Sequence, residues 1–196
     1  MVEATVISII DIDYGGNAVS RTSSATRPKG SATASLLLRL TVGPMLVFHG
    51  YSKIFGGGGL GGTARYFEKL GLRPGVLHAG LGAGTEIGAG TLMTVGALSP
   101  LPAAGAIGLM ATAARTDHKG KGVLVFKGGW EYTGVVAAAA AAMAALGPGP
   151  LSVDRIRGKE RSGLVWTGTA LAVGLGSAAG LLSRVKTEPA AEVSPT

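Results

Sequence analysis

Glu86 is a carboxylate residue in the middle of a long apolar segment, residues 74–98. In a helix that rises about 1.5 Å per residue, it lies about 18 Å from Pro74, near the centre of a bilayer. A carboxylate at that depth is costly unless it is paired, protonated or faces a cavity. We therefore expect Glu86 to have a partner in the preceding apolar segment, where Arg39 and His49 are the candidates.

Two interpretations of this carboxylate stay open. An Arg39–Glu86 pair can serve only to fix how two helices pack, since buried ion pairs are often kept for specificity. Alternatively, Glu86 relays protons or takes part in a hydrogen bond to a carbonyl group such as that of a quinone. The first apolar segment supplies a matching polar face, because Arg39 and Lys53 fall within about 40° of one stripe of a helix.

The histidines add candidates for acid–base chemistry. His49 is the better one, because Lys53 lies one turn further along the same helix face. Glu86 and His49 are thus the candidates for a catalytic role, which the sequence leaves unassigned. His49 and His78 fall at the same membrane side and could together hold a haem, although interfacial histidines are the commoner arrangement. Glu131, which lies between two aromatic residues, is a secondary candidate.

The composition places these residues in a membrane protein. Hydrophobic residues make up 46% and charged residues 15% of the 196 residues, whereas a soluble domain carries about 25% charged residues. The chain has no cysteine, which excludes disulfides, thiolate-bound iron–sulfur or zinc sites and a cysteine nucleophile. With three histidines in all, we expect no metal site. The net charge of +7 lies in the gaps between apolar segments, which favours lipid phosphates over nucleic acid as the partner.

Apolar segments separated by polar gaps predict an all-α fold, a polytopic membrane helix bundle. We expect four membrane helices to form its core within residues 32–154. These helices are predicted over residues 32–55, 74–98, 103–114 and 128–146. A basic linker and a fifth membrane helix are predicted within residues 155–184, where the apolar run covers 163–183.

The remaining segments are polar. Residues 1–31 predict a mobile tail, since their apolar patch is too short for a cleaved signal, and residues 185–196 predict a disordered end. Between the first two membrane helices, residues 63–70 predict a short helix that lies on the bilayer surface. Thr63 is its expected N-cap and Gly71 its expected left-handed C-cap.

Alternating spans define two sides, side A where the first helix begins and side B where it ends. The polar residues that could take part in acid–base or binding chemistry gather at side B: His49, Lys53, His78, His118, Lys119, Lys121, Lys127, Glu131 and Tyr132. The loop cations lean toward an N-terminus on the outside. Two stripes of small residues permit close helix packing and equally a homo-oligomer. They are Gly80, Gly84 and Gly88, and Ala172, Gly176 and Gly180.

Several stretches, taken in order, resemble the DoxX family. LLLRLTVGPMLVFHGYSKIFG resembles its opening motif, with LLLRL, HG and K-[LI]-F-G. GTARYFEKLGL resembles its loop helix, and Gly82 to Gly90 with Glu86 resembles its second helix. GGWEYTGVV resembles the opening of its fourth helix, and LGPGPLSVD its closing stretch. The resemblance runs from about Leu36 to Asp154, and the chain adds an N-terminal tail and the apolar run at 163–183.

The resemblance implies a four-helix integral membrane core. Members are associated with membrane redox systems, including a subunit of thiosulfate:quinone oxidoreductase, and with complexes that dock redox or sulfur-transfer enzymes. The residues that the resemblance carries over, as a candidate quinone site, are Arg39, His49, Lys53, Glu86 and Glu131.

We therefore expect a multi-pass protein of the bacterial plasma membrane, serving as a subunit or anchor of a quinone-linked redox complex. The quinone head group would lie near His49, Lys53 and Glu86, and no other cofactor is evident. Whether the chain itself takes part in an oxidoreductase reaction is left open. The alternatives are a non-enzymatic scaffold that holds soluble proteins at the membrane and a small proton-coupled transporter that uses Glu86.

Overall fold

The computed structural model describes residues 29–185, and the tails predicted before and after this range lie outside the described residues. Within the range all regular elements are helical and there is no strand, as predicted. The helices are α1 (Lys29–Phe55), α2 (Gly59–Lys69), α3 (Gly75–Val95), α4 (Leu101–Thr116), α5 (Glu131–Leu146), α6 (Val153–Ile156) and α7 (Leu164–Leu182). A 3-10 turn, η1 (Val125–Lys127), precedes α5.

The short helix α2 begins earlier than its sequence indicates. Its N-cap is Gly58, which is left-handed with φ 93°. Thr63 lies inside the helix, where its hydroxyl donates to the carbonyl of Lys53 at 2.8 Å, so the prediction that Thr63 is the N-cap is wrong. The predicted stop is confirmed, because Gly71 has φ 82° and its N–H donates to the Glu68 carbonyl at 3.0 Å.

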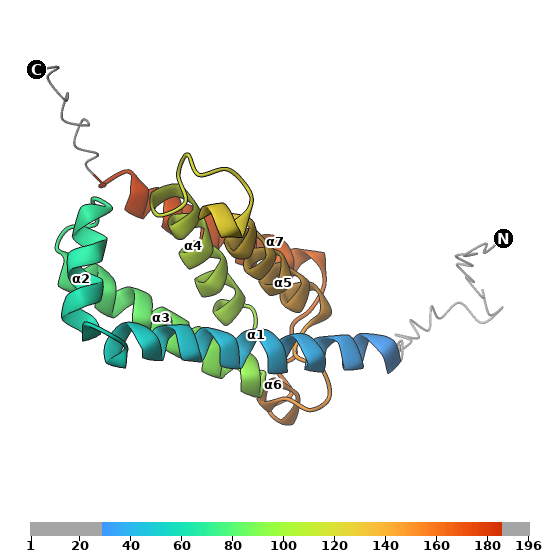
Figure 1. Cartoon of the computed structure of the whole chain (residues 1–196). Helices are drawn as coiled ribbons and strands as arrows, with labels where there is room; N and C mark the ends of the chain where they lie inside the picture. The colour runs from blue at the N-terminus through green and yellow to red at the C-terminus, as the bar shows by residue number, and fades with distance from the viewer. Residues whose placement is uncertain (1–28, 186–196) are drawn as a thin grey trace, which may run out of the picture.

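Helices α1 and α3 lie side by side and antiparallel, and glycines let their backbones meet (Figure 1). A Cβ added to Gly43 would lie 2.8 Å from the carbonyl oxygen of Gly90. Two turns further along α1, a Cβ on Gly50 would lie 2.7 Å from the carbonyl oxygen of Ala83. Small residues permit this approach where helices pack in an apolar medium. The contact fixes which residues of α1 stand opposite Glu86.

Helices α4, α5 and α7 form a second group against this pair, and α2 crosses the side-B end of α1 and α3 (Figure 1). Helix α7 packs on α4 through another glycine contact, where a Cβ on Gly174 would lie 2.7 Å from the carbonyl oxygen of Ala104. Leu46 and Ile107 are the largest fully buried apolar side chains of the core between the two groups.

The outer surface of the bundle is apolar. Helix α1 over Gly30–Phe55 and helix α7 over Leu164–Leu182 are long and apolar enough to cross a membrane. Large apolar side chains such as Phe48, Leu81 and Val135 point outward rather than into the core. Contiguous apolar surface of this kind is rare on soluble monomers and suits contact with lipid.

Candidate functional site

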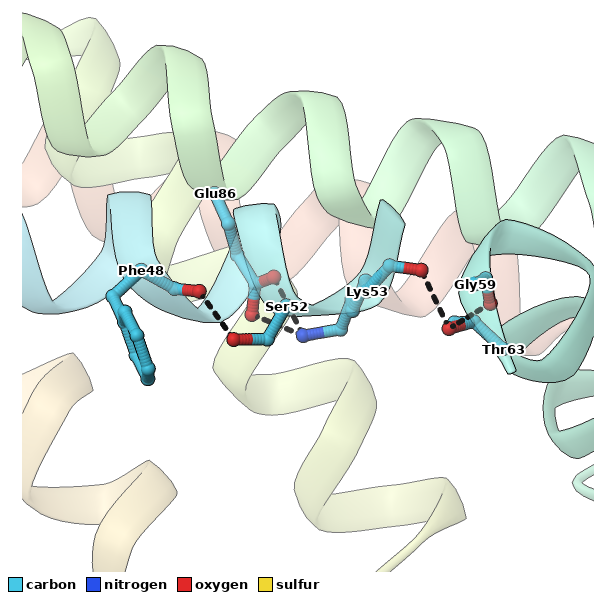
Figure 2. Close-up of polar contacts among 6 residues, drawn as sticks. All are labelled: Phe48, Ser52, Lys53, Gly59, Thr63 and Glu86. Carbon is cyan, nitrogen blue, oxygen red and sulfur yellow. Dashed lines mark hydrogen bonds and ion pairs between the residues drawn. The ribbon is translucent and has the colours of Figure 1, made fainter. Parts of the chain in front are cut away.

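Glu86 is paired with Lys53. The Lys53 Nζ lies 2.7 Å from Oε1 and 2.5 Å from Oε2 of Glu86 (Figure 2). The Glu86 side chain is 5% exposed and that of Lys53 is 24% exposed, so the carboxylate is buried and the lysine side chain is partly exposed. The prediction that this carboxylate needs a partner in the first helix is confirmed. The expected Arg39–Glu86 pair is wrong.

The position of α1 along α3 explains why Glu86 pairs with Lys53 and not with Arg39. A Cβ on Gly50 would lie 3.0 Å from the Cβ of Glu86, so these two residues stand at the same level. Lys53 follows Gly50 by almost one helical turn, and its long side chain reaches back to the carboxylate (Figure 2). Arg39 lies about three turns before Gly50, at the side-A end of the helix pair.

Arg39 has a different set of partners, all of them backbone carbonyls. Its Nε donates to Met93 at 3.0 Å, its Nη1 to Pro148 at 2.6 Å and its Nη2 to Thr94 at 2.9 Å. Met93 and Thr94 belong to the last turn of α3, where carbonyls lack partners within their own helix. Arg39 is 4% exposed and thus joins the ends of α3 and α5 at side A. The structure does not bring it to Glu86.

A cavity of about 520 Å³ opens beside the Lys53–Glu86 pair, between α1, α2, α3, α4 and α5. Its polar lining includes His49, Lys53, Tyr66, Glu86, His118 and Tyr132. Its apolar walls include Phe67, Leu109 and Met110. The cavity is partly open to the outside, and Tyr66 of its side-B lining is 44% exposed. Of the residues predicted to gather at side B, the ones that line this pocket together with Glu86 are His49, Lys53, His118 and Tyr132.

Tyr132, in the first turn of α5, was predicted to lie at side B and is a residue of the pocket, although it was not among the candidate site residues. Its ring centroid lies 5.5 Å from that of His49. Its hydroxyl is buried and has no hydrogen-bond partner among residues 29–185. The motif GGWEYTGVV contains Tyr132 but does not place it in the pocket, because that position depends on α5 meeting α1 at this height.

Tyr66 and Asp117 close one wall of the pocket. The Tyr66 hydroxyl donates to Asp117 Oδ1 at 2.5 Å, and Lys121 Nζ lies 3.2 Å from the same oxygen. Burial and the bond to Asp117 raise the pKa of Tyr66 to about 12. Partial burial opposes ionisation of Asp117, but hydrogen bonds from Tyr66 and Lys121 and the nearby His118 hold the pKa of this carboxyl below its usual range. The contact joins α2 to the end of α4.

Two other predicted residues lie outside the pocket. Glu131 accepts a hydrogen bond from the Val125 N–H at 3.0 Å and so holds the turn before α5. His78 lines a separate cavity between α3, α4 and α7, so it does not share a pocket with His49 and the haem arrangement is not formed. In the described part of the chain, no group of three histidine or acidic side chains is placed to hold a metal ion.

The fold and the site together define a helical membrane protein with a polar pocket between its helices at one end. The DoxX family model matches residues 34–119, from α1 to just beyond α4. The chain is a DoxX family protein over these residues, which include Lys53, Glu86 and Asp117. The match ends before α5, so the resemblance of residues 128–154 to the family lies outside it. No curated protein and no solved structure matches the chain.

Proposed function

We propose that this protein is a multi-pass subunit or anchor of a quinone-linked redox complex in the plasma membrane, with the quinone head group in the pocket beside Lys53 and Glu86. The family is a membrane family that is often linked to redox-related functions. The observation that carries the proposal is a buried carboxylate–ammonium pair that borders a cavity of about 520 Å³. Cavities of about 300–1,000 Å³ suit small ligands.

The residues of the pocket suit a quinone head group. A quinone presents a planar ring and two carbonyl acceptors, and it takes up two electrons and two protons when it is reduced. Phe67, Leu109 and Met110 offer apolar contact with a ring. Lys53 and His49 offer donors within the pocket, and the exposed side of Lys53 gives the pair a route for protons to side B. The chain has no cysteine for an iron–sulfur cluster, so a partner protein would deliver electrons.

The binding experiment uses the full chain in lipid nanodiscs and a short-chain ubiquinone as the probe. We expect the wild type to bind and Glu86→Gln to bind at least about tenfold more weakly, since loss of the carboxylate frees Lys53 from its position. Glu131→Gln is the matched control, because Glu131 lies outside the pocket and holds a turn instead. If the wild type does not bind more probe than empty nanodiscs do, the proposal is wrong.

A second experiment addresses the complex. Affinity purification from native membranes in mild detergent should recover an oxidoreductase or sulfur-transfer enzyme in a fixed ratio to this chain. Recovery of soluble partners without quinone binding would favour the scaffold reading. Quinone-independent proton uptake that is lost in Glu86→Gln, in protein that still accumulates, would favour a proton-coupled transporter.

A further inference from the structure

Tyr132 carries a hydrogen-bond donor that the protein itself leaves unused. Its hydroxyl is the one buried side-chain polar atom without a hydrogen-bond partner within residues 29–185. Folded proteins pair nearly all buried polar groups, and an unpaired one points to a function or to a missing ligand. The Tyr132 side chain lines the pocket, and its buried hydroxyl is the unpaired group of that side chain.

The carboxylate of Glu86 is engaged in an ion pair with Lys53. Both carboxylate oxygens of Glu86 accept from Lys53 Nζ, at 2.7 and 2.5 Å. The charge of the carboxylate is therefore balanced by Lys53. The Tyr132 hydroxyl on α5 is a neutral donor of the same pocket. A neutral donor in an apolar setting matches a neutral acceptor such as a carbonyl oxygen.

The position of Tyr132 is fixed by its surroundings. The Glu131 N–H donates to the Val123 carbonyl at 2.8 Å, and Thr133 Oγ1 donates to the Trp130 carbonyl at 2.8 Å. These bonds hold the first turn of α5, while the His49 ring lies against the Tyr132 ring at 5.5 Å between centroids. A donor held this firmly loses little freedom when a ligand binds.

We propose that the Tyr132 hydroxyl donates a hydrogen bond to a carbonyl oxygen of the bound ligand and thereby selects carbonyl-bearing rings over plain aromatic ones. This inference rests on the proposed quinone site and deepens it. Tyr132 becomes a specificity-determining residue of that site.

The test compares wild type with Tyr132→Phe in nanodiscs, using menadione and 2-methylnaphthalene, which share the ring system and differ in the two carbonyls. The wild type should prefer menadione. Tyr132→Phe should bind menadione about five- to tenfold more weakly, with little change for 2-methylnaphthalene. Tyr51→Phe is the matched control, because Tyr51 is exposed on α1 and does not line the pocket.

Thermal unfolding of the ligand-free protein provides the second measurement. Because the hydroxyl is unpaired, Tyr132→Phe should unfold at the same temperature as the wild type or at a higher one. A clear loss of stability would show that the hydroxyl has a partner in the empty protein and would overturn the inference. Equal menadione affinity of variant and wild type would overturn it while leaving the quinone site standing. Absence of wild-type menadione and ubiquinone binding would overturn both proposals.

Discussion

At the scale of single residues, the two members of the Lys53–Glu86 pair differ in how deeply the charge that remains is buried when the other member is removed. The Glu86 side chain is 5% exposed, whereas the Lys53 side chain is 24% exposed. A buried charge that loses its partner is strongly destabilising, while replacement of a whole pair by apolar side chains is often tolerated.

We therefore expect Lys53→Met to destabilise the protein more than Glu86→Gln does. Loss of one partner of a buried pair costs about 3–5 kcal/mol, and Lys53→Met should approach that range because it strands the carboxylate. The double variant Lys53→Met, Glu86→Leu should recover much of the loss. Unfolding by heat in a fixed detergent measures all of them. A double variant as unstable as the sum of the single ones would contradict a coupled pair.

The sequence was sufficient to indicate that Glu86 needs a partner, but not to name it. Arg39 and Lys53 share one stripe of α1, and the choice between them depends on how far α1 is shifted along α3. That shift is set by contacts such as Gly43 with Gly90, which are tertiary. The same limit applies to Tyr132, whose place opposite His49 depends on how α5 docks.

At the scale of elements, side-chain hydrogen bonds to the end of α1, the start of α3 and the end of α4 hold α2 at the wall of the pocket. Thr63 donates to the Lys53 carbonyl at the end of α1, and Tyr66 donates to Asp117 at the end of α4. The Tyr66–Asp117 contact depends on charge, because the pKa of Asp117 is lowered in the folded protein. A carboxylate with a lowered pKa stabilises the fold above its unfolded pKa, and this contribution is lost as pH falls through the folded value. Tyr66, with its pKa raised to about 12, remains a donor throughout.

The position of α2 should consequently depend on acid pH. Since the chain has no cysteine, a double variant with Arg65→Cys on α2 and Arg115→Cys on α4 can carry one nitroxide label at each position. The distance distribution between them should be narrow at neutral pH and broaden as Asp117 is protonated, below the usual carboxyl range. In Tyr66→Phe the distribution should already be broad at neutral pH. A distribution that stays narrow in acid would show that other contacts hold α2.

The stripes of small residues show that sequence periodicity does not by itself identify the helix face that packs against a neighbour. The glycine of α3 that meets α1 most closely is Gly90, where an added Cβ would lie 2.5 Å from the carbonyl oxygen of Gly43. The parallel stripe of Gly80, Gly84 and Gly88 has open space around it, as have Gly176 and Gly180. In helices made largely of glycine and alanine, several faces are small, and periodicity alone does not select the one that packs.

At the scale of the whole molecule, α7 is part of the bundle although it lies outside the family match. It packs on α4 through Gly108 and Gly174, and Ala170 and Ala178 of the same helix are buried. The fifth apolar run predicted from the sequence thus forms a helix that covers α4 and α5. The packing of α7 on α4 can be tested by adding one methyl group at a contact glycine.

Gly174→Ala should destabilise the protein by about 1–3 kcal/mol, the range for overpacking. The added Cβ would lie 2.7 Å from the Ala104 carbonyl oxygen, which is backbone and cannot move aside without separating the helices. Gly176→Ala, two residues further on α7 with open space around it, should be neutral or slightly stabilising because alanine favours helix. Thermal unfolding of both variants checks this, and equal melting temperatures would argue against the α4–α7 contact.

The hydrogen bonds of Arg39 at side A bear on how far the pocket extends through the protein. Among the described residues, none of α3 beyond Glu86 and none of α1 before His49 lines the pocket. Beyond them lie the buried Leu46 and then Arg39, whose three bonds seal the ends of α3 and α5. The pocket therefore does not extend along α1 and α3 to side A, and a ligand beside Glu86 would be separated from that side by Leu46 and by the hydrogen bonds of Arg39.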